Sequence, residues 1–294
     1  MATKIVCFGE VLFDVFPTHR KIGGAPLNVG LRMASLGIDT QIISRIGQDE
    51  IGKELLDFIT QNGVSTDIIQ IDPHFATGEV LVQLDEKGSA SYTINCPVAW
   101  DKIEATSEAQ NTVAKADALV FGSLVCRDNT SHQSLVRLLH SAKYKIFDVN
   151  LRAPFYTKEL LLELMNEADF IKFNDDELYE ISAFLGSPYH SLEQNLQFIA
   201  VKTNTQHICV TKGSHGAVLL YNSQLYYNSG YKITVADTVG AGDSFLAGLL
   251  TQLLTGVSPQ KAIDFACALG ALVAQQEGAN PIISPETIAE FMQI

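Results

Sequence analysis

Short apolar runs alternate along this chain with longer segments whose apolar residues recur at helical spacing. Each short run ends in a small or polar residue, which is typical of a buried strand. Strands that alternate with helices predict parallel βαβ units and a doubly wound α/β sheet with helices on both faces. Ligands bind beyond the carboxyl ends of the strands in such sheets. The predicted strands lie in 4–9, 40–47, 118–123, 145–150, 170–174 and 207–213, and the predicted helices in 25–37, 51–63, 130–142 and 158–168.

Residues 77–94 (TGEVLVQLDEKGSASYTI) break this pattern. Apolar and polar residues alternate on both sides of 85–88 (DEKG), which predicts a β-hairpin with a glycine-containing turn. A second strand candidate, 10–17 (EVLFDVFP), lies near the N-terminus. We expect these antiparallel strands to form a small sheet, or lid, over the ligand site. An edge extension of the main sheet is the alternative.

Composition and charge restrict the partners that are expected. The chain has 294 residues, of which 47% are hydrophobic, so it is long enough for a sizeable core. Its formal net charge is −13 and no cluster of Lys and Arg opposes it, so neither nucleic acid nor an acidic membrane surface is expected as a partner. A small anionic substrate stays compatible with that charge, because one pocket can be locally positive.

Cysteine and histidine patterns argue against a metal centre built from these residues. The five cysteines form no CxxC pair, and the seven histidines have no ligand spacing such as HExxH. Scattered, unpaired cysteines are typical of a reducing compartment. The N-terminus lacks the layout of a signal peptide, and no apolar run reaches the roughly 20 residues that span a bilayer. We therefore expect a cytoplasmic protein.

The stretch 235–250 (VADTVGAGDSFLAGLL) combines a small-residue turn with a helix start. Gly240, Ala241 and Gly242 allow another group to approach the backbone, and the unpaired N–H groups of a helix start attract an anion. Asp243 lies at the same place and can accept a proton from a hydroxyl. Phosphoryl transfer to an alcohol requires this combination of a base and an anion hole. A strand is predicted over 231–237, ending at Asp237 just before this turn. A glycine turn with a capping Asp is the simpler alternative to the catalytic interpretation.

The stretch 23–37 (GGAPLNVGLRMASLG) has two glycines before a helix that carries Asn28 in its first turns. The backbone at Gly23 and Gly24 can come close to a ligand. The Asn28 amide can both donate and accept hydrogen bonds, which suits the adjacent hydroxyls of a sugar. A tight turn followed by a solvent-facing polar residue is the alternative.

These two stretches, together with 46–52 (IGQDEIG), resemble the signature motifs of the ribokinase-like (PfkB) carbohydrate kinase family. Both motifs at this separation are highly specific, and the resemblance runs over nearly the whole chain. It implies a single ribokinase-like kinase domain over 1–294, a three-layer α/β/α fold with lid strands near 10–20 and 77–100. No GxxxxGK[ST] sequence occurs, so ATP would be held differently from a Walker-type site.

The resemblance implies roles for the residues that match the family's motifs. Asp243 would be the base, and Gly240, Ala241 and Gly242 would form the anion hole. In 174–177 (NDDE), Asn174 and Glu177 would organise Mg²⁺ with its waters and the phosphates. In 211–216 (TKGSHG), Thr211, Gly213 and Gly216 would lie near the ATP phosphates or ribose. A capped helix start and a β-turn are the structural alternatives for these two motifs.

For the sugar, the resemblance implies binding by Asp14, Gly24 and Asn28, with Asn150 and Arg152 at the end of a strand. The version with Arg is typical of members that act on ketohexoses or keto-sugar acids. Arg152 could instead serve the phosphoryl group, a substrate carboxylate or a surface ion pair.

The segment 277–285 (EGANPIISP) lies where family members line the adenine pocket and a monovalent-cation loop. Asn280 is the candidate near adenine. Asp237, Val239 and Gly278 are candidates for a potassium site, mostly through backbone carbonyls.

The segments 96–103 (CPVAWDKI) and 147–156 (FDVNLRAPFY) resemble fructokinase-type members. The expected activity is transfer of the ATP γ-phosphate to a sugar, with fructose 6-phosphate as product, Mg²⁺ and K⁺ as cofactors, and a homodimer formed through the lid. A 2-keto-3-deoxygluconate kinase, a ribokinase and a non-catalytic sugar-binding regulator are the alternatives. A Rossmann-type dehydrogenase is disfavoured because GxGxxG is missing after the first strand.

Overall fold

The computed structural model describes residues 3–84 and 90–293. The strands are β1 (Lys4–Phe8), β2 (Leu12–Val15), β3 (Arg20–Gly23), β4 (Asp39–Gly47), β5 (Ile69–Asp72), β6 (Gly78–Leu84), β7 (Ala90–Ile94), β8 (Ala118–Gly122), β9 (Lys145–Asp148), β10 (Phe170–Asn174), β11 (His207–Thr211), β12 (Ala217–Tyr221) and β13 (Gln224–Asn228). The α-helices are α1 (Ala25–Ser35), α2 (Glu50–Gln61), α3 (Ser107–Lys115), α4 (Asn129–Leu139), α5 (Lys158–Glu167), α6 (Asp175–Phe184), α7 (Leu192–Thr203), α8 (Ala241–Leu254), α9 (Pro259–Ala274) and α10 (Pro285–Phe291). Short 3₁₀ turns lie at η1 (Ala99–Lys102), η2 (Leu124–Arg127) and η3 (Gly213–His215).

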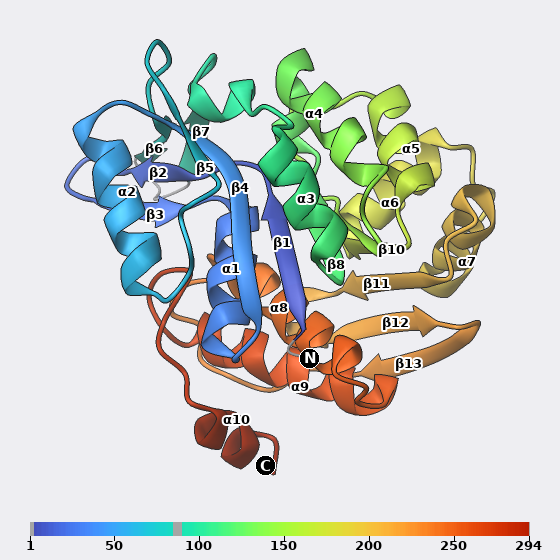
Figure 1. Ribbon diagram of the computed structural model, residues 1–294. Coiled ribbons are helices and arrows are strands. Elements are labelled where there is room, and N and C mark those ends of the chain that lie inside the picture. The colour runs from blue at the N-terminus through green and yellow to red at the C-terminus, as the bar shows by residue number, and fades with distance from the viewer. Residues whose placement is uncertain (1–2, 85–89, 294) are drawn as a thin grey trace.

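A nine-stranded sheet forms the centre of the molecule, in the order β13-β12-β11-β10-β9-β8-β1-β4-β5. The strands from β11 to β5 run parallel, and β12 and β13 add an antiparallel edge (Figure 1). The prediction of a doubly wound, mostly parallel sheet is confirmed. The chain leaves β1 toward β4 on one side and later fills the other side from β8 onward. A ligand crevice is therefore expected beyond the carboxyl ends of β1 and β8.

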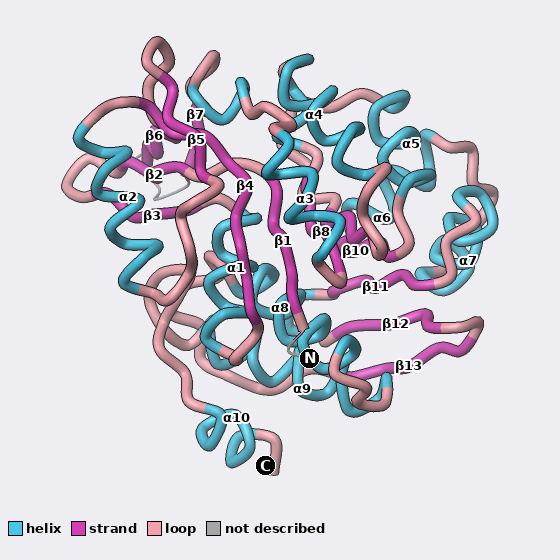
Figure 2. The backbone as a smooth tube through the Cα atoms, viewed as in Figure 1, coloured by secondary structure: helices cyan, strands magenta, loops and turns pink. Residues whose placement is uncertain are grey.

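Helices cover both faces of this sheet, as the tube in Figure 2 shows. Apolar side chains of α1, α2, α8 and α9 form one buried layer against it. Those of α3, α4, α5, α6 and α7 form a second layer on the other face. Parallel strands buried on both faces are nearly continuous apolar runs, which is why their sequences show little alternation.

A second, four-stranded sheet has the order β3-β2-β6-β7. The predicted hairpin is confirmed, because β6 and β7 pair antiparallel, while its expected turn at 85–88 lies outside the described residues. The strand β3 was not predicted and pairs antiparallel with β2. Residues 9–11 connect β1 directly to β2, so this small sheet starts at the carboxyl end of the central strand.

The expected strand over 231–237 is wrong, because the structure has no strand there. The N–H groups of Ala236 and Asp237 instead donate to the carbonyl of Ala274, at 2.9 and 3.3 Å. The β12–β13 hairpin already forms this edge of the sheet, so the segment packs on the end of α9 instead. Within the described residues, no helix is long and apolar enough to cross a membrane.

Candidate active site

The turn before α8 brings Asp243 to the first turn of that helix without using it as a cap. Gly240 is the N-cap residue with φ 74°, and no side chain caps this helix end. The Asp243 carboxylate instead accepts a hydrogen bond of 2.8 Å from the side-chain amide of Asn28, which lies on α1. The capping alternative for Asp243 is therefore wrong, and its charge stays available to a ligand. Two observations require glycine at position 240. Its φ of 74° is left-handed, and a Cβ there would lie 2.5 Å from the Ala279 Cα.

The surroundings of Asp243 raise its pKa, so its carboxylate takes up a proton more readily than an exposed Asp does. Burial raises the pKa of Asp243 to about 6, and the negative charge of Asp148 adds to that shift. The hydrogen bond from Asn28 and the positive charge of Lys172 act against this shift and lower the pKa of Asp243. A carboxylate with this pKa is ionised at neutral pH and is a stronger base than an exposed Asp.

Three segments are tied together around Asn28. The Asn280 side-chain amide donates to the side-chain oxygen Oδ1 of Asn28 at 2.9 Å, so the Asn28 side chain links Asn280 to Asp243. Arg32, one turn further along α1, donates to the Ser244 hydroxyl at 3.1 Å and to the Pro281 carbonyl at 2.9 Å. These bonds fix the start of α8 against both α1 and the segment after α9.

A cavity of about 500 Å³ opens beside the start of α8, which is a volume usual for small-molecule sites. The structure brings most of the predicted ATP-site residues to its wall, namely Asn174, Thr211, Gly213, Gly216 and Gly242, together with Ala241 of the predicted anion hole. Gly240, also predicted for the ATP site, is not among the residues that line this cavity. Apolar groups of Tyr231, Ile233, Val235 and Phe245 complete it. Asn280, expected near adenine, is not among the residues that line this cavity, because its side chain turns toward Asn28.

Asn174 and Glu177 form a capping box at the start of α6. The Glu177 N–H donates to the side-chain oxygen Oδ1 of Asn174 at 2.8 Å, and Glu177 Oε2 accepts from the Asn174 backbone N–H at 2.8 Å. The structural alternative for this motif is therefore present. Glu177 also reaches further, since its Oε1 accepts from the Leu151 N–H at 2.9 Å. The carboxylate thus fixes the segment that follows β9 as well as its own helix.

A buried ion pair that the sequence analysis missed lies beneath the anion-hole turn. Lys172 Nζ donates to Asp148 Oδ1 at 3.0 Å, and both side chains are at most 8% exposed. Burial by itself would lower the pKa of Lys172, but the carboxylates of Asp148 and Glu177 outweigh it and raise that pKa. Asp148 Oδ2 has no hydrogen-bond partner. The available signal was a lysine inside the apolar strand 170–174 (FIKFN).

Two of the candidate sugar residues lie at the small sheet, Asp14 on β2 and Gly24 directly after β3, and Asn28 follows on α1. Burial raises the pKa of Asp14 on β2, while the charges of Arg152 and Lys21 lower it. Gly23 lets the chain pass close to Asp14, because a Cβ there would lie 2.6 Å from Asp14 Oδ2. Gly24 has φ 111° and turns the chain into α1. Binding of a sugar by Asp14, Gly24 and Asn28 stays a prediction.

Arg152 and Asn150 lie on the loop after β9. Arg152 is exposed and donates only to the neighbouring Leu151 carbonyl, at 2.9 Å, so the surface ion-pair alternative has no support in the described residues. Its charge lowers the pKa of Asp243. Asn150 has φ 41°, a left-handed conformation that Asn tolerates better than most residues.

Glu10 is a second residue that the sequence analysis missed. It lies two residues after the end of β1 and is 2% exposed, and its Oε2 has no hydrogen-bond partner. Burial raises the pKa of Glu10 to about 7, with the charge of Arg152 lowering it and that of Asp243 raising it. A glutamate directly after a buried strand was the only signal in the sequence.

The three residues predicted for a potassium site are brought together. Asp237 Oδ1 accepts from the Val239 N–H, and Asp237 Oδ2 accepts from the Gly278 N–H, both at 3.0 Å. The Lys21 ammonium, on β3 of the small sheet, lies 3.4 Å from Asp237 Oδ2. Burial would raise the pKa of Asp237, but these partners lower it below its usual value.

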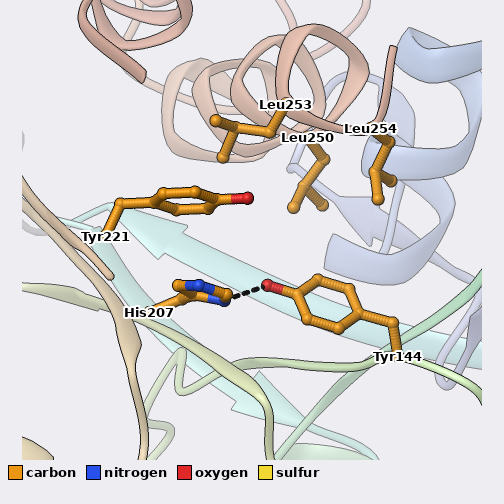
Figure 3. A pocket seen from close by; sticks show the side chains of 6 residues that line it. All are labelled: Tyr144, His207, Tyr221, Leu250, Leu253 and Leu254. Atoms are coloured by element: carbon orange, nitrogen blue, oxygen red, sulfur yellow. Dashed lines mark hydrogen bonds between the residues drawn. The ribbon is translucent and has the colours of Figure 1, made fainter. Parts of the chain in front are cut away.

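A smaller cavity of about 160 Å³ lies at the other end of α8, lined by Leu250, Leu253, Leu254, Tyr144, His207 and Tyr221 (Figure 3). The Tyr144 hydroxyl and His207 Nδ1 are hydrogen-bonded at 2.7 Å. The other ring nitrogen of His207 pairs with Asn222 Oδ1 at 3.0 Å. Since the His207 ring nitrogens are satisfied within the chain, they offer little to a ligand.

The chain is similar over most of its length to known carbohydrate kinases. The model of the pfkB family of carbohydrate kinases matches residues 2–286. A fructokinase of Vibrio alginolyticus is 28% identical over 95% of this chain and 95% of its own length. The crystal structure of an uncharacterized sugar kinase from Pyrococcus horikoshii in complex with ATP has a TM-score of 0.82 and 27% identity, covering 94% of this chain and 93% of that chain. A Vibrio cholerae fructokinase double mutant in its fructose, ADP and potassium bound form has a TM-score of 0.85 over 99% of this chain and 98% of that chain, and at 24% identity it shows the shared fold.

Proposed function

This chain belongs to the pfkB family of carbohydrate kinases, and from that premise we propose that it transfers the γ-phosphoryl group of ATP to fructose, giving fructose 6-phosphate. The observation that carries the proposal is the Asp243 carboxylate, held by Asn28 at the start of α8 beside a cavity of about 500 Å³. The choice of fructose is supported by the fructokinases among its relatives and by the resemblance of 147–156 to such members.

ATP fits the cavity by its shape and lining. Glycine backbone at Gly213 and Gly216 borders one side, where it can approach phosphates or ribose closely. Apolar walls at Tyr231, Val235 and Phe245 suit a purine base. The N–H groups at the start of α8 point their partial positive charge toward the phosphates, as helix starts do with anions.

Magnesium fits the oxygen donors beside that cavity. The described residues contain no cluster of three or more His, Cys, Asp or Glu that would cage a metal ion. Glu177 and Asp148 are buried carboxylates near Lys172, and Asp148 Oδ2 is unpartnered. They would hold Mg²⁺ through its waters, as this ion prefers. Bound Mg²⁺ would neutralise charge on the phosphate oxygens.

The chain's own residues then supply orientation, proton transfer and charge stabilisation. Asp14, Gly24 and Asn28 orient the sugar hydroxyls between the two sheets. Asp243 accepts the proton of the attacking hydroxyl as the phosphoryl group moves in line. Backbone N–H groups of 240–242 and the Lys172 ammonium stabilise the charge that develops on the phosphoryl oxygens. The small sheet excludes water, which would otherwise accept the phosphoryl group.

A 2-keto-3-deoxygluconate kinase is the second candidate, favoured by Arg152. Its guanidinium is exposed and pairs with no carboxylate among the described residues, so a substrate carboxylate would suit it. Bidentate pairing of this kind requires arginine geometry, so Arg152→Lys should raise KM for an acid substrate more than for a neutral sugar.

The test is ADP release with Mg²⁺ and ATP, offering fructose, ribose, 2-keto-3-deoxygluconate, adenosine and glucose in parallel. The proposal expects the highest kcat/KM on fructose. Preference for the keto acid would keep the mechanism and assign Arg152 to its carboxylate. Equal or better turnover of ribose or adenosine would overturn the assignment of fructose.

A further inference from the structure

One of the potassium ligands expected from the sequence, Asp237, already has a positive charge beside its carboxylate. Asp237 accepts two backbone N–H groups, from Val239 and Gly278, and so joins the segment before α8 to the segment after α9. The Lys21 ammonium lies 3.4 Å from the same carboxylate, in a hydrogen bond and ion pair. Among described residues, Lys21 is the only cationic side chain paired with Asp237.

Lys21 comes from the small sheet rather than from the body of the kinase. It lies on β3, directly opposite Asp14 of β2 in the antiparallel register, so both side chains share one face. Its charge acts on Asp14 as well as on Asp237. The ammonium therefore connects the sugar side of the site with the turn that leads to Asp243.

The segments that Asp237 joins also position the base. Gly240 touches Ala279 so closely that a Cβ would not fit, and Asn280 holds Asn28, which binds Asp243. A cation at Asp237 therefore supports the geometry of the anion hole and the base together. A second cation at the same carboxylate would be repelled by the first, so Lys21 disfavours a potassium ion there.

We propose that Lys21 is a built-in substitute for a monovalent cation, delivered to Asp237 by the small sheet. It is a positioning residue, and the inference rests on the proposed kinase activity of this site. It follows that the kinase works without potassium and that removal of the ammonium creates a requirement for the ion.

The experiment compares wild type, Lys21→Met and Lys21→Arg in KCl and in choline chloride at equal ionic strength. Wild type and Lys21→Arg should have kcat values in the two salts within about twofold of each other. Lys21→Met should lose about tenfold in kcat in choline chloride and regain most of it in KCl. Lys4→Met is the matched control, because Lys4 also pairs with an aspartate, Asp39 at 3.2 Å, outside the site.

Thermal unfolding gives a readout that does not depend on turnover. KCl, relative to choline chloride, should raise the Tm of Lys21→Met and leave that of wild type unchanged, since only the variant has an open cation position. A sugar-contact role for Lys21 would instead raise KM without potassium rescue, and that result would overturn the proposal. Strong potassium activation of wild type, unaltered in Lys21→Met, would also overturn it. Should wild type phosphorylate none of the acceptors, the proposed function fails separately, and the Tm comparison still decides the role of Lys21.

Discussion

The two ends of α8 are built from the same helix and serve opposite purposes. At its N-terminal end, Gly240 to Asp243 combine a left-handed turn, a helix start that no side chain caps, and a carboxylate beside a cavity of about 500 Å³. At its C-terminal end, leucines pack toward Tyr144 and His207 around a cavity of about 160 Å³ (Figure 3). A cavity lined by aromatic side chains is therefore not by itself a ligand site. A ligand site also needs polar groups that have no hydrogen-bond partner within the protein.

The N-terminal end of α8 is surrounded by buried charged side chains, which lower the stability of the fold. Around the N-terminal end the chain buries Asp148, Lys172 and Glu10, and leaves single oxygens of Asp148 and Glu10 without a partner. Such groups destabilise a fold unless a ligand completes them. At the C-terminal end both ring nitrogens of His207 are satisfied. We expect the first end to determine activity and the second to determine stability.

Replacing the base gives the largest expected effect. Asp243→Asn keeps an oxygen for the Asn28 amide but cannot take a proton, so kcat should fall by about 100- to 10,000-fold with a small change in sugar KM. Steady-state kinetics on the best acceptor measure this. Asp57→Asn, an exposed residue of α2, is the control and should behave as wild type. Near-normal turnover of Asp243→Asn would contradict its assignment as the base.

Truncating the opposite end should separate stability from activity. Leu250 is 1% exposed, and Leu250→Ala should lower the free energy of unfolding by about 2–5 kcal/mol. Because the anion hole lies at the other end of the helix, kcat of the folded variant should stay near that of wild type. Urea unfolding and kinetics on the same preparation measure both quantities. A large loss of kcat in folded protein would show that the two ends are coupled and would break the comparison.

The pH dependence gives the smallest expected effect. Because burial raises the pKa of Asp243 to about 6, the base is ionised above that pH and protonated below it. Thus kcat/KM should be flat above pH 6, apart from any effect of Glu10, and fall about tenfold per unit below it. Stability should follow the opposite sign, since a raised folded pKa makes the ionised carboxylate destabilising at neutral pH. If folded protein kept its full kcat/KM down to a pH of about 4, near the usual pKa of Asp, the assignment of the pH dependence to Asp243 would be refuted.

Local patterns in the sequence determined the element types because they depend on neighbours along the chain. The apolar runs at 4–9 and 118–123 became β1 and β8, and the helical spacing after Gly24 became α1. The hairpin at 77–94 followed from strict alternation. The segment 231–237 was misread because its composition suits a strand, while the occupied sheet edge left it no partner. Propensity cannot report an occupied edge.

The motif residues were also within reach of the sequence, since glycines and an aspartate at a helix start carry a recognisable chemistry. Which groups meet across the fold was decided by tertiary structure alone. Asn280 turned toward Asn28 instead of the cavity, and Lys21 met Asp237 from a strand that no pattern had indicated. Burial, and with it the pKa of Asp243, is likewise a property of packing. Residues more than two hundred positions apart share no local signal, and only the folded chain brings their charges within reach of one another.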